Sequence, residues 1–163
     1  PNVKLSAEVL KKFNIKNALV YSCTYDGIHY LDELLPIGCV NLTRIKDSNV
    51  EKSISSYIQE ALCLESNFNI SKIKEKEDKE KNVLSSLKIL KGEGNKSQVD
   101  AICINASIFL LLADKVNSME EGYNLAKKVL KTGKVWNVFL NVVDLYNGDS
   151  KKINELVDKY IEI

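Results

Sequence analysis

The sequence predicts an α/β protein in which a few strands, including a β-hairpin, are followed by a helical C-terminal half. Three observations predict this class. Apolar residues at helical spacing in residues 3–13 lead into a short apolar run. Two strand-like runs, at residues 39–45 and 50–58, flank a turn-forming segment. From residue 78 onward only helical periodicity recurs, so strands and helices alternate too briefly for a complete doubly wound domain.

The first half should begin with a helix and a strand. Residues 3–13 form the predicted helix, which ends at Asn14. The residues expected to face the core are Leu5, Val9, Leu10 and Phe13. Residues 17–22 are short and apolar, which is typical of a buried strand.

The middle of the chain should hold the hairpin and a polar link. Residues 46–49 have the composition of its turn. Residues 60–70 look irregular, and residues 71–81 form a charge run of interspersed sign, which favours a solvated connection. A helix is predicted over residues 78–90, with an inward stripe of Val83, Leu84, Leu87 and Leu90.

A long helix over residues 98–116 opens the second half. Ser97 and Asp100 resemble a capping box at its start. The helix is apolar nearly all round, so we expect a central, covered element. Asn105 is the strongly polar residue in the middle of this helix. We expect its side chain to bond neighbouring backbone, because leaving it unpaired would cost on the order of a few kcal/mol.

Three more helices should follow. Ser118 and Glu121 form a capping box for a helix that runs to residue 132 and stops at Gly133. The next covers residues 134–146, and Asp149 or Ser150 caps the last. The residues expected to face inward in these last two helices are Val135, Val138, Phe139, Val142, Val143, Ile153, Leu156, Val157 and Tyr160.

Composition narrows the class of protein. The chain has 163 residues, 45% hydrophobic and 28% charged, which is ordinary for one globular domain. A net charge of +1 gives no reason to expect a nucleic-acid or membrane partner. The apolar run at residues 101–113 is too short to span a bilayer. No signal peptide is visible, so we expect a cytoplasmic protein.

Cysteine chemistry is not expected. The four cysteines contain no C-x-x-C pair, and the single histidine, His29, is not at ligand spacing from any of them, which disfavours zinc. Free thiols are the expectation for an intracellular protein. A catalytic pair of a Cys23 nucleophile and a His29 partner is disfavoured, because the sequence predicts that both residues lie in one loop.

Asp32 and Glu33 are the candidate metal ligands. They follow the first strand and its turn within a short apolar frame that Pro36 closes. Mg²⁺ prefers oxygen ligands and often takes only one or two protein carboxylates plus phosphate oxygens. The residues alone leave a second interpretation open, since an Asp-Glu pair is also common in solvated turns.

The ordered set of motifs resembles the C-terminal region of the anthranilate phosphoribosyltransferase family. In the second half these are Asp100, the Asn105–Ala106 pair in an apolar helix, and a Ser-x-x-Glu-Gly-x-x-x-Ala cap at residues 118–126. In the first half they are a helix, an Ala-Leu-Val strand at residues 18–20, the Leu-Asp-Glu turn, the hairpin and the polar link. The resemblance covers nearly the whole chain in the same order.

This resemblance implies a fold and an activity. The fold would be the C-terminal part of the phosphoribosyltransferase/nucleoside-phosphorylase-type α/β domain. The reaction would be the Mg²⁺-dependent transfer of phosphoribose from phosphoribosyl pyrophosphate to anthranilate, in tryptophan biosynthesis. The family's Asp-Glu pair, which holds the metal that binds pyrophosphate, corresponds to Asp32 and Glu33. No catalytic residue is assigned in this chain, and its substrate-binding residues remain unassigned.

Several family features are missing. Neither the Gly-Thr-Gly-Gly-Asp phosphate loop nor the Lys-His-Gly-Asn-Arg segment occurs in residues 1–163. We therefore expect a single C-terminal portion that lacks the phosphate-loop half and the N-terminal helical subdomain. Such a portion would be inactive alone and would need the missing half or a second copy as its partner. The connection at residues 26–30 looks longer than usual, and Val99 stands where the family often has arginine.

Two alternatives stay open. The chain could be a truncated, non-catalytic homologue that acts as a binding or structural module. It could also be a relative of the pyrimidine nucleoside phosphorylases, although the Asn105 helix and the cap at residues 118–126 favour the first family.

Overall fold

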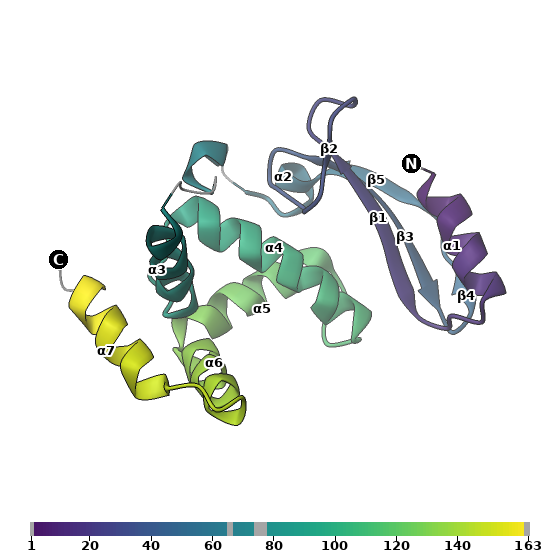
Figure 1. The fold of residues 1–163 in the computed structure, drawn as a ribbon. Coiled ribbons are helices and arrows are strands. Elements are labelled where there is room, and N and C mark those ends of the chain that lie inside the picture. The colour runs from purple at the N-terminus through teal and green to yellow at the C-terminus, as the bar shows by residue number, and fades with distance from the viewer. Residues whose placement is uncertain (1, 65–66, 74–77, 162–163) are drawn as a thin grey trace. The chain divides into compact units, whose positions relative to one another are not determined.

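The computed structural model describes residues 2–64, 67–73 and 78–161 (Figure 1). The chain divides into two compact units, one of Pro1–Phe68 with Asp100–Asn124 and one of Asn69–Val99 with Leu125–Ile163. The elements are α1 (Val3–Lys12), β1 (Ala18–Thr24), β2 (Tyr30–Leu31), β3 (Cys39–Lys46), β4 (Asn49–Val50), β5 (Ile54–Tyr57), α2 (Ile58–Ala61), the 3₁₀ turn η1 (Ile70–Lys72), α3 (Lys79–Leu90), α4 (Lys96–Leu112), α5 (Met119–Lys131), α6 (Lys134–Leu145) and α7 (Ser150–Ile161). The predicted mixed α/β class is confirmed.

The first unit is built on a five-stranded antiparallel sheet. Its order is β2-β1-β3-β4, and β5 also pairs with β3. The predicted hairpin is confirmed, with Asp47 and Ser48 at positive φ (48° and 65°) in a two-residue turn. Its second strand is shorter than predicted. It is interrupted after Val50, and Ile58 begins α2, in keeping with the weak alternation of this stretch.

Helix α1 lies alongside the sheet (Figure 1) but buries a different face from the predicted one. Ala7 is 0% exposed, whereas Leu5 and Phe13 are 62% and 74% exposed, and Val9 is also exposed. The small side chains on the Val3–Ala7 face let the helix backbone approach the strands closely. The prediction that Leu5, Val9 and Phe13 face the core is therefore wrong.

The start of α4 also differs from its prediction. Asn95 and Gln98 form the cap, because Gln98 N–H donates to Asn95 Oδ1 at 3.1 Å and Asn95 N–H donates to Gln98 Oε1 at 3.3 Å. Ser97, predicted to be the cap, is buried inside the helix, and its hydroxyl accepts from Asn69 N–H. The helix ends at Leu112, earlier than predicted, and Asp114 takes a left-handed φ of 51°.

Helix α4 is only partly covered. Ile104 and Ser107 are fully buried, but Ile102 and Phe109 are exposed on its other side, so the expectation of a fully covered helix is wrong. The capping box of α5 is confirmed, since Glu121 N–H donates to Ser118 Oγ at 3.1 Å. The carboxylate of Glu121 accepts from Asn117 N–H rather than from Ser118 N–H.

The second unit has a small helical core. Leu87, Trp136 and Val157 come from α3, α6 and α7, and Leu90, Phe139, Leu140 and Ile153 pack around them. Asp149 caps α7 by accepting from Lys152 N–H at 2.9 Å.

Several inward predictions for this unit are wrong. Val83, Val138, Val142, Leu156 and Tyr160 are exposed. On α6 the buried residue is Trp136, with Phe139 and Leu140 packed beside it, and its indole N–H donates to Asn154 Oδ1. Residues 74–77 of the predicted charged link lie outside the described residues. Within the described ranges no helix is long and apolar enough to cross a membrane.

Candidate functional site

Asp32 and Glu33 lie in a bend that directly follows β2, and both side chains are exposed. The next three residues, Leu34, Leu35 and Pro36, are buried. The chain therefore passes from sheet to core within a few residues and leaves the two carboxylates on the surface. The turn predicted at this position is confirmed.

One side chain from α4 holds the bend. Leu34 N–H donates to Asn105 Oδ1 at 3.1 Å, and Asn105 Nδ2 donates to Leu34 O at 2.9 Å. The same amide nitrogen donates to Ala101 O, one turn back in α4, at 2.8 Å. The expected pairing of Asn105 with backbone is confirmed, and the Leu34 partner lies 71 positions away in sequence.

The other end of the bend is fixed by the sheet. Leu31 pairs with Cys23 of β1, in register with the Thr24–Tyr30 pair. Gly38 passes so close to β1 that an added Cβ would lie 2.3 Å from Cys23 Sγ and 3.2 Å from Leu35 O. A larger residue there would have to displace the Cys23 side chain and would crowd the Leu35 carbonyl.

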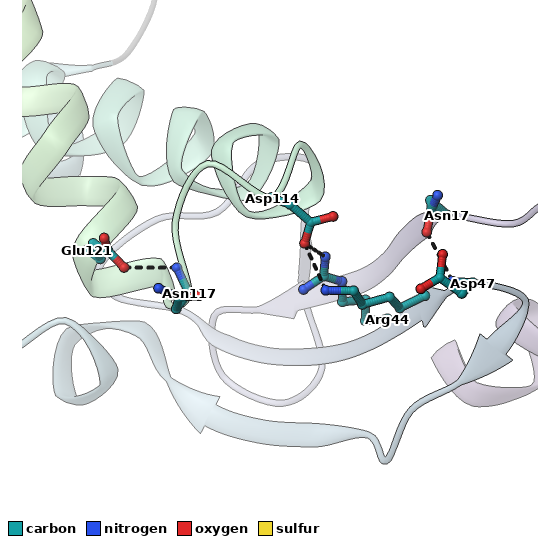
Figure 2. A network of polar contacts seen from close by, with 7 residues as sticks. Asn17, Arg44, Asp47, Asp114, Asn117 and Glu121 are labelled. Atoms are coloured by element: carbon teal, nitrogen blue, oxygen red, sulfur yellow. Dashed lines mark hydrogen bonds and ion pairs between the residues drawn. The ribbon is translucent and has the colours of Figure 1, made fainter.

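A second set of polar contacts ties α4 to the same sheet. Figure 2 shows Arg44 of β3 reaching Asp114, in the loop after α4. Arg44 and Lys46 approach Asp114 Oδ1 at 2.7 and 3.0 Å. Hydrogen bonds from Lys46 and Arg44 hold the pKa of Asp114 below its usual value. Within the first unit, α4 and the loop that follows it are therefore attached to the sheet and its bend at two places. One is Asn105, and the other is Asp114, after the C-terminal end of the helix.

The loop before the bend is ordered by Asp26. Its Oδ1 accepts from the backbone N–H groups of Ile28 and His29, and its Oδ2 lies 2.7 Å from His29 Nδ1. The backbone and ring bonds from His29 lower the pKa of the Asp26 carboxyl well below its usual range. Burial raises the pKa of the Cys23 thiol, which is 1% exposed.

The pair at residues 32 and 33 suits one kind of metal chemistry. In the part of the chain that the structure describes, no three His, Cys, Asp or Glu side chains gather as a metal-binding group. Two adjacent exposed carboxylates on a fixed backbone fit a Mg²⁺ ion that takes its other ligands from phosphate oxygens and water. They do not fit a closed structural site, which needs a full set of protein ligands.

Other residues of the sequence motifs have structural roles. Asp100 is 1% exposed and accepts from Tyr123 OH at 2.7 Å. Gly122 meets Ser107 so closely that an added Cβ would lie 2.9 Å from Ser107 Cβ. Both contacts join α4 to α5 within the first unit. These motif residues therefore hold two helices together rather than contact the two carboxylates.

The Tyr123 contact leads to a prediction about pH. Burial, and then the hydrogen bond to Asp100, raise the pKa of the Tyr123 phenol above its usual value. A phenol with a raised folded-state pKa contributes its full stability below pH of about 10 and loses it as the pH rises further. We expect the free energy of unfolding of the wild type to exceed that of Tyr123→Phe at pH 8, and this difference to shrink above about pH 10.

Urea denaturation of both proteins from pH 8 to pH 11 measures that difference. Subtracting the free energy of unfolding of Tyr123→Phe from that of the wild type cancels the contribution of lysine titration, because the two proteins have the same lysines. A gap that stays constant across the series would show that the phenol does not hold its proton more tightly in the folded state.

The two carboxylates stand out in the sequence, but the contacts that fix their backbone do not. No local sequence pattern links Asn105 to Leu34, because their contact depends on how α4 packs against the sheet and the bend that follows β2. The one usable signal was a strongly polar side chain in an apolar helix, which predicts a buried partner but not its identity. The β2 pairing was missed because two residues are too few for a periodic signal.

Comparison with known proteins gives a consistent result. The profile of the family described as "Glycosyl transferase family, a/b domain" matches residues 2–136. A protein of Petrotoga mobilis named anthranilate phosphoribosyltransferase is 30% identical over 141 residues, which is 86% of this chain and 38% of that protein. Proteins of the same name from Pelagibacter ubique and Bacillus cereus (strain B4264) are each 28% identical, over 83% and 91% of this chain. The chain spans about two fifths of the length of these relatives.

Proposed function

Because the chain belongs to the glycosyl transferase family, a/b domain, we propose that it forms the C-terminal portion of an anthranilate phosphoribosyltransferase. Its substrates in the intact enzyme would be phosphoribosyl pyrophosphate and anthranilate. The proposal rests on the shared name of the reported relatives and on the position of Asp32 and Glu33. The same relatives favour this reading over a pyrimidine nucleoside phosphorylase.

In this proposal Asp32 and Glu33 hold Mg²⁺. The observation that supports it is that both carboxylates are exposed while the residue after them is buried and bonded to α4. A carboxylate on a fixed backbone loses side-chain freedom but little backbone freedom when it binds a metal. The pair supplies negative oxygen ligands, and the phosphate groups of the substrate would complete the site.

The bound metal would neutralise the charge that develops on a departing pyrophosphate. The chain itself provides the two carboxylates and the rigid support behind them. Two further parts of the active site would belong to the remaining three fifths of a protein like its relatives. These are the phosphate loop and the residues that contact anthranilate. We therefore propose that this portion alone does not turn over substrate.

A non-catalytic binding or structural module is the second candidate. The genomic sequence directly upstream of the codon for Pro1 distinguishes the two. An in-frame glycine-rich phosphate loop supports the enzyme. A start codon immediately before Pro1 would leave this chain without that loop and would favour the module.

Isothermal titration tests the metal site. We expect phosphoribosyl pyrophosphate to release measurable heat on binding to this protein at millimolar Mg²⁺, and the heat to disappear in Asp32→Ala, because one of two protein ligands is lost. The matched control is Glu51→Ala, an exposed carboxylate on the same sheet unit, which should bind as the wild type does.

Two results would count against the site. The first is an absence of heat with the wild type at millimolar metal. The second is equal heat with Asp32→Ala and the wild type, which would place any binding elsewhere on the protein.

A further inference from the structure

We infer that Asn105 is a positioning residue for the Asp32–Glu33 carboxylates, an inference that rests on the function proposed above. Asn105 does not itself reach out to the surface pair. It acts through Leu34, the residue that follows Glu33, by bonding both the N–H and the carbonyl of that residue. Leu34 lies outside the strands, so this side chain replaces the partner that a neighbouring strand would otherwise provide.

The amide group of Asn105 is matched to this task. Its oxygen accepts from Leu34 N–H, and its nitrogen donates to Leu34 O and to Ala101 O. Both amide hydrogens are used, and the bond to Ala101 fixes the side chain against its own helix. A carboxylate of the same size offers only acceptors, and leucine offers none of these bonds. Glutamine is one methylene longer and would push the bend away from α4.

The bend is consequently held at two points that lie close together. Leu31 is fixed by its pairing with Cys23, and Leu34 is fixed by Asn105. Only Asp32 and Glu33 lie between them. A trans peptide link spans about 3.8 Å between Cα atoms, so two residues between fixed points have little room to move their backbone. The side-chain rotamers are then the main freedom left to the two carboxylates.

This arrangement predicts a specific consequence for metal binding. Groups that orient the ligands of a metal typically change its affinity by about 10–100-fold when they are removed. With Asn105 replaced by alanine, the Leu34 end of the bend is released while Asp32 and Glu33 are both retained. The metal then has to order the bend as it binds, and its affinity falls.

The test compares Asn105→Ala with a variant of the neighbouring residue. Ile104 is 0% exposed, and Ile104→Val removes one buried methylene from the same helix while it leaves the Asn105 side chain and its bonding groups in place. Asn105→Asp serves if the alanine variant does not fold, since it keeps the acceptor for Leu34 N–H and loses both donors. The probe is Mn²⁺ with inorganic pyrophosphate, followed by paramagnetic broadening of the backbone amide signals of residues 31–35.

We expect the apparent dissociation constant of Mn²⁺ to rise about tenfold or more in Asn105→Ala and to stay near the wild-type value in Ile104→Val. Without metal, we expect the Leu34 amide to exchange its hydrogen faster in Asn105→Ala but not in Ile104→Val. Asn105→Asp should exchange the Leu34 amide hydrogen faster than the wild type does, because both donors to the two carbonyl oxygens are lost.

The outcomes separate the two proposals. If the wild type shows no broadening at residues 31–35, the proposed metal site fails, and the positioning role fails with it. If the wild type binds Mn²⁺ there and Asn105→Ala binds it equally well, the positioning role is overturned and the metal site stands. Equal losses in Asn105→Ala and Ile104→Val, or unchanged exchange at Leu34, would also overturn the positioning role.

Discussion

Leu34→Ala is expected to lower the free energy of unfolding by about 2–5 kcal/mol, the largest change among the substitutions considered for this chain. Leu34 is 0% exposed, and its backbone is bonded to Asn105 on both sides. Truncation to alanine removes the buried methyl groups and leaves a cavity that the fixed backbone cannot collapse into. Because small domains are stable by only about 5–15 kcal/mol, the loss is a large share of the total.

Leu5→Ala is the matched control, since it makes the same chemical change at a leucine that is 62% exposed. Its effect should stay within about 0.5 kcal/mol of zero. Urea denaturation followed by circular dichroism measures both. Equal effects of the two substitutions would mean that Leu34 is not buried as the structure has it.

Gly122→Ala is expected to destabilise the protein even though alanine is the better helix former. The intrinsic preference alone would favour alanine by about 1 kcal/mol. At this position in α5 the added Cβ would lie 2.9 Å from Ser107 Cβ, 3.0 Å from Ser107 Cα and 3.1 Å from Ser107 O. Two of these neighbours are backbone atoms of α4, so the contact cannot be relieved by a side-chain rotation.

The helices must instead move apart, and overpacking of this kind costs typically about 1–3 kcal/mol. We therefore expect the midpoint of urea denaturation to fall. Asn124→Ala, at an exposed position of the same helix, should leave the midpoint unchanged or raise it slightly. A rise in the midpoint for Gly122→Ala would show that α4 and α5 are farther apart than described.

The local features of the chain could be predicted from its sequence because they depend on near neighbours. The hairpin turn at Asp47 and Ser48, the capping box at Ser118 and the turn after the first strand are each set by residues within a few positions. The candidate metal ligands followed from the same kind of signal, two adjacent acids after a strand.

The facing of amphipathic elements was harder to predict. The pattern in α1 has two candidate apolar faces, one with Leu5, Val9 and Phe13 and one with Val3 and Ala7. The greater hydrophobicity of Leu5, Val9 and Phe13 favoured the first face as the buried one. In the structure the face with Val3 and Ala7 is buried instead, because small side chains let a helix approach a sheet closely. On α6 the core contacts are made by Trp136, Phe139 and Leu140, of which only Phe139 was predicted to face inward.

The backbone bonding of Asn105 was expected from its sequence, but its partner Leu34 could not be predicted from local patterns. Asn105 and Leu34 are 71 positions apart in the sequence, and Arg44 and Asp114 are 70 positions apart. Such pairs form only when α4 packs against the sheet. The residues around each side chain in the sequence do not indicate which residue it will contact. The sequence therefore predicted the ligands of the proposed site, and the structure was needed to find what holds them.

The most direct test of the central proposal is crystallographic. Crystals of this protein soaked with Mn²⁺ and pyrophosphate, measured at a wavelength where manganese scatters anomalously, locate the metal without ambiguity. The proposal predicts an anomalous peak beside the bend, with oxygens of Asp32 and Glu33 at coordination distances of about 2.0–2.3 Å. A peak at other carboxylates, with none at this bend, would contradict it.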